Sequence, residues 1–170
     1  MTQPAAWLRG PVEGIDSWLT PAALGFIQAS EDCAAAVDGL TAAEVWAPVP
    51  GGAATIGFHL RHVAGTTERL LTYARGEALT PEQIASARAE ADPGEHPPGA
   101  EELRQEVERA IARALEQLRA TPRETLLEAR AVGRAALPTT VLGAITHAAE
   151  HAQRHAGQAL TTVRVLRALR

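Results

Sequence analysis

Four stretches of this 170-residue chain place apolar residues at every third or fourth position, and this spacing constrains the fold more than any other feature. A period near 3.6 residues puts the apolar side chains on one face of an α-helix. The third stretch is the clearest, with Leu103, Val107, Ile111, Ala114 and Leu118 among Glu and Arg. We therefore expect long helices over residues 20–39, 55–75, 100–120 and 138–170.

Residues that start and stop helices agree with these ranges. Thr20 and Pro21 predict a helix start, because threonine suits the cap position and proline the first helical position. Gly39 and Gly76 are expected to close the first two helices, and Pro138 to open the last.

Composition and length indicate one helical domain. The chain is rich in alanine and only 4% aromatic, which suits close-packed helices better than a sheet. Residues 41–44 are expected to form a short turn and 80–83 to open a minor helix, whereas 121–137 is expected to be a connection without a strand. Trp7 and Trp18 should pack against the helices. We predict an all-α four-helix bundle over residues 1–170, a single domain with short extra helices in its connections.

Charge and residue usage exclude several functions. The net charge of −4 argues against a nucleic-acid partner, and because all sixteen basic residues are arginine, a P-loop and a Schiff-base lysine are excluded. With no apolar run of roughly 18 residues and no signal-peptide pattern, we expect no membrane contact and a cytoplasmic protein. The single cysteine, Cys33, is expected to be a small core residue.

Five of the six histidines fall in two short windows. His59 and His62 lie in the second predicted helix, and His147, His151 and His155 in the fourth. Residues four apart on a helix differ by only about 40° in direction, so the last three form one stripe. Two imidazoles at this spacing can reach one ion, and the second helix can supply a third nitrogen. Three neutral imidazoles suit zinc, nickel or ferrous iron and leave positions for water or substrate.

The alternative is a set of ordinary surface or core histidines, although clustering on two helices favours the metal. Two other helical metal sites are excluded. A ferritin-like di-iron site needs Glu three residues before a histidine, and a zincin needs Glu directly after the first histidine; the sequence has neither. The sixth histidine, His96, lies in a Pro/Gly-rich loop and is expected to be exposed and without a role.

The sequence resembles the DinB-like (DinB/YfiT-type) four-helix-bundle proteins over most of its length. One part of the resemblance is the segment Thr55-Ile-Gly-Phe-His-Leu-Arg-His-Val-Ala-Gly, and the other is Glu150-His-Ala-Gln-Arg-His-Ala-Gly-Gln. A histidine in the second helix followed by His-x-x-x-His-x-Gly-Gln in the fourth is the metal signature of that family. The resemblance implies His62, His151 and His155 as the ligands of a divalent metal.

Other residues near this signature have open roles. His59 and His147 are extra to the family pattern, and they are candidates for partners of the ligands, alternative ligands or acid–base groups. Gln158 lies on the face of His151 and His155, where it could orient a ligand or a metal-bound water, or form an interhelical hydrogen bond. Gly157 is expected to let two helices approach closely.

The resemblance also implies a metal-dependent enzyme, because characterised relatives include transferases and isomerases that use low-molecular-weight thiols. A metal-dependent S-transferase acting on a small-molecule substrate, with such a thiol as partner, is the first hypothesis, and a metal-dependent hydrolase follows. The alternative from another class is a non-catalytic metal-binding or dimerisation domain. We also expect a homodimer.

Overall fold

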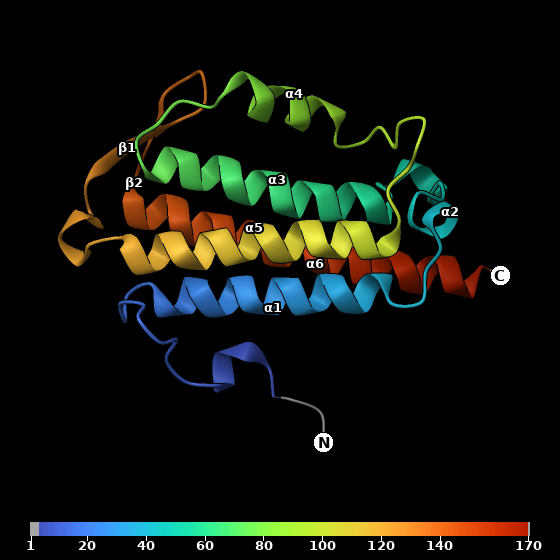
Figure 1. Ribbon diagram of the computed structural model, residues 1–170, viewed down its shortest axis with the longest axis horizontal. Coiled ribbons are helices and arrows are strands. Elements are labelled where there is room, and N and C mark those ends of the chain that lie inside the picture. Colours follow the sequence, from blue (N-terminus) through green and yellow to red (C-terminus); the bar gives the residue numbers. More distant parts are fainter. Residues whose placement is uncertain (1–3, 170) are drawn as a thin grey trace.

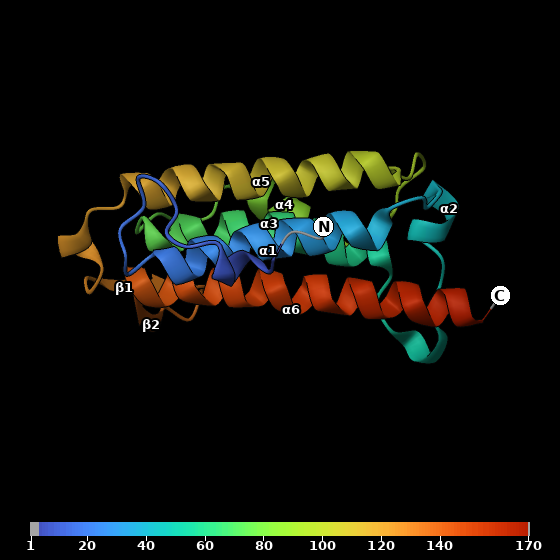
Figure 2. The same cartoon turned by 90° about the horizontal axis from the view of Figure 1, so that it is seen from below.

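Four long helices lie side by side in the computed structural model, which describes residues 4–169 (Figure 1). They are α1 (Thr20–Val37), α3 (Ile56–Ala74), α5 (Ala100–Ala120) and α6 (Val141–Ala168). Figure 2 shows α1 between α5 and α6, and α3 contacts the same two helices and so completes the bundle. The all-α fold class is confirmed.

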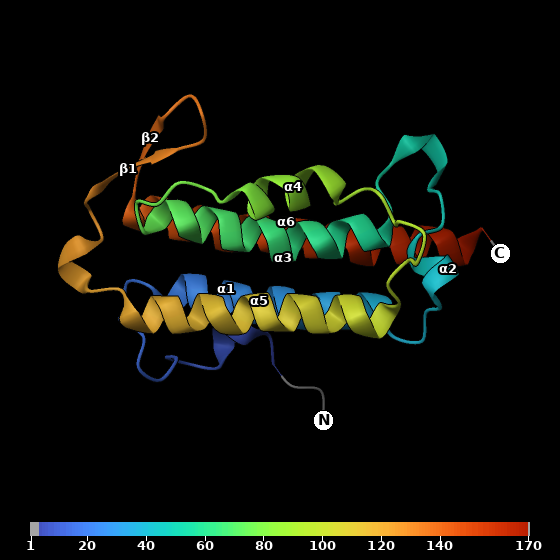
Figure 3. The same ribbon diagram turned by 45° about the horizontal axis from the view of Figure 1, so that its top comes forward.

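The direction of the helices determines one of the connections. The colours of Figure 1 show that α3 and α5 run in the same direction, opposite to α1 and α6. Two consecutive parallel helices need a connection that returns along the bundle. Here it carries the short helix α4 (Pro81–Ala89), which lies along α3 (Figure 3).

The predicted helix boundaries agree closely with the structure. Helix α5 begins at Ala100 and ends at Ala120, and all five of its predicted inward residues are buried. Helix α3 is capped by Thr55, whose side chain accepts a hydrogen bond from the backbone N–H of Phe58. Helix α1 differs slightly, because Thr20 is its first residue instead of its cap.

The remaining connections contain short elements. These are η1 (Ala6–Leu8), α2 (Ala42–Val45), η2 (Pro50–Gly52), η3 (Arg123–Thr125), β1 (Ala129–Val132) and β2 (Leu137–Thr140). Capping boxes at Thr41 and Thr80 start α2 and α4. The minor helix expected after Thr80 is therefore present, and the turn expected at residues 41–44 is a short helix.

The connection before α6 was predicted wrongly. Strands β1 and β2 form an antiparallel hairpin, in which Pro138 pairs with Ala131. Proline is tolerated there because both strands of a two-stranded hairpin are edge strands. Helix α6 begins at Val141 instead, and the side chain of Thr140 caps it by accepting a hydrogen bond from Gly143.

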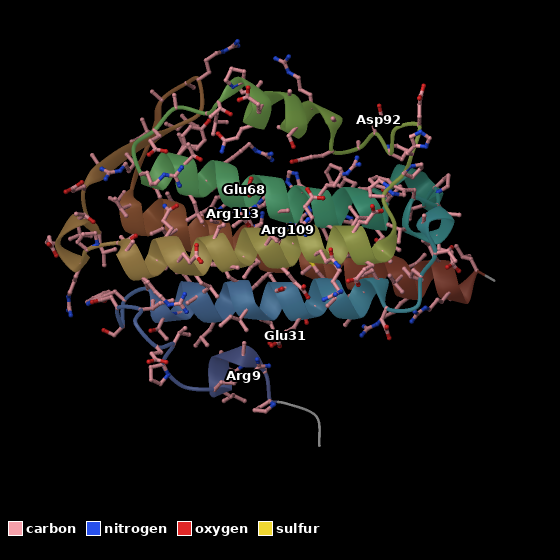
Figure 4. All side chains as sticks on the ribbon, viewed as in Figure 1. Arg9, Glu31, Glu68, Asp92, Arg109 and Arg113 are labelled. Atoms are coloured by element: carbon pink, nitrogen blue, oxygen red, sulfur yellow. The ribbon has the colours of Figure 1, made fainter. Side chains whose placement is uncertain are left out.

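The tryptophans near the N-terminus were also predicted wrongly. Trp7 is 71% exposed and Trp18 is 58% exposed. This segment is held to α1 by polar contacts instead, and Figure 4 shows Arg9 facing Glu31, to which its guanidinium donates two hydrogen bonds. No helix within residues 4–169 is long and apolar enough to cross a membrane.

Candidate metal centre

Three histidines from two helices converge where α3 and α6 pack together. His62 projects from α3, and His151 and His155 project from α6. Each ring has one nitrogen that lies within 4.8 Å of one nitrogen in each of the other two rings. The Nε2 atoms of His62 and His151 are 2.9 Å apart, and the ring centroids of His62 and His155 are 4.4 Å apart.

These separations suit one metal ion. Two nitrogens bound to zinc at about 2.05 Å lie about 3.3 Å apart at a tetrahedral angle and about 2.9 Å apart at a right angle. The separation between His62 and His151 is already in this range. The nitrogens of all three rings lie within 4.8 Å of one another, so the residues present fit a divalent ion.

A buried carboxylate contacts the outer nitrogen of His62. Glu90, the residue after α4, is 5% exposed, and its Oε2 lies 2.6 Å from His62 Nδ1. Its other oxygen, Oε1, lies 2.7 Å from Arg69 Nη1. Burial raises the pKa of this carboxyl, but the contacts with His62 and Arg69 outweigh burial and leave the pKa below its usual value. The carboxylate is therefore ionised at neutral pH.

A fourth histidine contacts the outer nitrogen of His155. His59 is 6% exposed, and its Nδ1 lies 3.1 Å from Nδ1 of His155. The ring of Phe58 stacks on His62, with centroids 5.1 Å apart, and meets His155 edge-on. His59 is thus part of the cluster, as a partner of a candidate ligand.

Burial lowers the pKa of three of these imidazoles. The pKa of His59, His151 and His155 falls to about 4 in each case, first because burial disfavours the charged ring and then because His62 lies nearby. These rings are therefore neutral at pH 7, which is the form that binds a metal.

A cavity of about 740 Å³ opens beside the cluster. His59 and His155 form part of its wall. Its apolar lining consists of Val49, Pro50, Ala53, Ala54, Phe58 and Val165, and its polar lining includes Arg154, Gln158, Thr161 and Thr162. Gln158 is exposed to this cavity, a position suited to contact with a small molecule.

The expectation for Gly157 is wrong. It is exposed and lines the same cavity, and a Cβ atom built on it would have no neighbour within 4 Å. The glycine keeps the cavity open; it does not bring two helices together.

The other candidate residues lie outside the three-histidine group, although the ring of His147 contacts that of His151, with centroids 5.7 Å apart. His147 is exposed, and its Nδ1 lies 3.4 Å from a carboxylate oxygen of Glu150. His96 is exposed in its loop, as expected. Cys33 is fully buried and burial raises the pKa of its thiol to about 12, so it is a core residue without nucleophilic character.

Comparison with known protein families gives one match, to the DinB superfamily, over residues 26–159. The chain belongs to the DinB superfamily. The match includes the three clustered histidines, His59 and Glu90, so the cluster lies inside the part of the chain that defines the family. The comparison with curated proteins found no match.

Sequence reasoning missed Glu90. It lies 28 residues after His62, beyond a glycine turn and a short helix, and no spacing in the sequence links the two. The one local signal is Gly65, one turn after His62 on α3. A Cβ atom there would lie 2.6 Å from Glu90 Oε1 and 2.7 Å from Arg69 Nη1, so with any larger residue this ion pair would have to shift.

Proposed function

We propose that this DinB-superfamily protein is a metal-dependent enzyme that transfers a low-molecular-weight thiol to a small electrophile. The observation that carries the proposal is the position of His155, which belongs both to the histidine cluster and to the wall of the cavity. A molecule in the cavity would therefore lie next to the metal site. Such a cavity with a few polar groups is the usual form of a small-molecule site.

We propose His62, His151 and His155 as the ligands of zinc, nickel or ferrous iron. Each of these metals accepts neutral imidazole and can keep open positions for a further ligand. A bound divalent ion lowers the pKa of a thiol or water that joins it, and so supplies a nucleophile near neutral pH.

The residues around the cluster would exclude water and orient the substrate. Phe58 and the apolar wall near Val49 exclude water from one side of the cluster, and Gln158 offers both a donor and an acceptor to orient a substrate. The chain cannot supply the sulfur itself, because Cys33 is buried away from the cavity lining. This favours a thiol that enters from solution.

Hydrolysis is the second candidate, and one observation favours it. His59 lies in the cavity wall against His155, and its pKa of about 4 keeps it neutral and able to accept a proton. A neutral imidazole in that position can accept a hydrogen bond from a water molecule and orient it for attack.

The test is a comparison of metal-loaded protein with a range of thiols and substrates. The protein would be incubated with bacillithiol, mycothiol or glutathione and chlorodinitrobenzene, and separately with an ester and amide panel. Thiol conjugation that depends on metal and is lost in His155→Ala supports the transferase. Hydrolysis without conjugation favours the second candidate. Neither activity, with metal bound, would leave a non-catalytic metal-binding domain.

We also propose that residues 1–170 form one domain that pairs as a homodimer. Sedimentation at micromolar concentration should give twice the mass of 17.9 kDa. A monomer alone at that concentration would contradict the pairing.

A further inference from the structure

We infer that Glu90 is a positioning residue, which holds the proton of His62 on Nδ1 and so turns the Nε2 lone pair toward His151 and His155. Because Glu90 directly follows α4, metal affinity then depends on whether the α4 segment is docked on α3. This inference rests on the proposed metal site. It adds a residue from outside the two helices that carry the histidines.

The geometry around Glu90 fixes the position of the proton. An ionised carboxylate can only accept hydrogen bonds, and Glu90 Oε2 lies 2.6 Å from His62 Nδ1. In the neutral form of the imidazole, which is the form that binds a metal, the proton must therefore be on Nδ1. Nε2, 2.9 Å from His151 Nε2, then carries the lone pair that a metal needs. A carboxylate in this position also increases the basicity of the imidazole.

Two features hold the carboxylate in this position. Arg69 balances its charge at 2.7 Å, which a carboxylate with 5% exposure requires. Gly65 leaves the space that the carboxylate and the guanidinium occupy. Glycine is a poorer helix former than alanine, so leaving this space lowers the stability of the helix.

The segment that carries Glu90 is attached by polar contacts. No residue of α4 itself is buried. Gln83 donates a hydrogen bond to the Thr72 hydroxyl at 2.9 Å, and Arg61 donates one to the backbone oxygen of Asp92 at 2.5 Å. Figure 4 shows Asp92 in the loop beyond α4, at the end near α2. Such a segment opens more readily than the apolar core, and when it opens Glu90 leaves His62.

The first test uses the metal-free protein and therefore does not depend on the proposed function. Nitrogen-15 NMR of the imidazole rings distinguishes the two tautomers. We expect His62 to carry its proton on Nδ1 at pH 7.5. A proton on Nε2 in the wild type would overturn the inference.

The second test measures zinc and cobalt affinity by competition with a chelator in untagged protein. Glu90→Gln should weaken binding by about 10–100-fold. Glu106→Gln is the matched control, because Glu106 lines the same cavity of about 410 Å³ as Glu90 and has no contact with a histidine. It should bind as the wild type does. Equal affinity in Glu90→Gln and the wild type would contradict the inference.

A third variant separates positioning from folding. In Gly65→Ala the added methyl displaces the carboxylate, whereas the helix gains stability from alanine. We expect weaker cobalt binding and an altered visible spectrum of the cobalt form, in protein that circular dichroism shows to be folded. In a Glu90→Gln background the same change should have little further effect on affinity. Full additivity of the two changes would mean that the methyl added at position 65 does not act by displacing Glu90. If the wild type binds no metal at all, the proposed function fails, and the tautomer alone decides this inference.

Discussion

The two faces of α6 bring different kinds of residue against their neighbours. Toward α1 the face is small and apolar, and a Cβ atom on Gly25 would lie 3.4 Å from that of Ala149. Toward α3 the face carries imidazoles, with His151 against His62 and His155 against His59. The first face excludes water and stabilises the bundle, whereas the second keeps neutral polar rings beside a cavity. We conclude that stability and the site are located on separate faces of one helix.

The largest expected effect is the pH dependence of the metal-free protein, which should come from the histidine face. The folded pKa of His59, His151 and His155 is about 4, whereas histidine in an unfolded chain titrates near 6.5. The unfolded chain therefore binds more protons in this window, and the free energy of unfolding should fall as pH is lowered from about 6.5 to 4. Melting temperatures measured from pH 7.5 to 4.5 should show this fall. Replacing all three residues by asparagine should flatten the curve between pH 5 and 7, and an equally steep curve in that variant would refute the assignment.

Binding of a metal to the histidine face should raise the melting temperature of the folded protein. A ligand that binds only the folded state adds about 2.7 kcal/mol when present at 100 times its Kd. For a chain of this size that is a rise in Tm of about 5–10 °C. His155→Ala should lose this rise. Ala149→Leu, on the other face, should keep it even though its starting Tm is lower.

Overpacking the face of α6 that contacts α1 tests whether this face can be changed without changing the metal site. Ala149→Leu adds three carbons where α1 and α6 are in contact, and should cost about 1–3 kcal/mol in free energy of unfolding. Thr146→Leu, at an exposed position one turn earlier on α6, is the control and should change stability little. Urea unfolding measures both. A loss of metal affinity in Ala149→Leu comparable to that in His155→Ala would show that the two faces are not separable.

The smallest expected effect comes from the cavity beside the histidine face. Gly157→Phe places a ring where the structure has open space, so the helix and the metal site should be unaffected. Activity toward substrates that occupy the cavity should fall about tenfold, which corresponds to about 1.4 kcal/mol. Steady-state kinetics with a metal titration on the same samples distinguishes this from loss of metal. Unchanged kinetics would place the substrate elsewhere.

The helices could be predicted from sequence because their signals are local. The spacing from Leu103 to Leu118 and the cap at Thr55 determine α5 and the start of α3 within a few residues each. The histidines could be placed on two helices by the same arithmetic. Their convergence depends on how α3 and α6 pack, and only the family resemblance predicted it.

The parts that could not be predicted depend on contacts between distant segments. Glu90 reaches His62 because α3 and α5 are parallel, so the connection between them returns along α3. The spacing of residues contains no such information. Pro138 was misread as a helix start because proline also fits an edge strand. Gly157 was misread because glycine in a helix suits either a close contact or an open cavity.

The most direct test of the account is the metal content of the untagged protein, measured beside His151→Ala after purification without chelator. A histidine tag must be removed first, because it binds the same metals. We predict about one zinc, nickel or iron per chain in the wild type and a large loss in the variant, with both proteins folded by circular dichroism. A wild type without metal that also binds none on titration, or a variant that keeps its metal, would contradict the central claim.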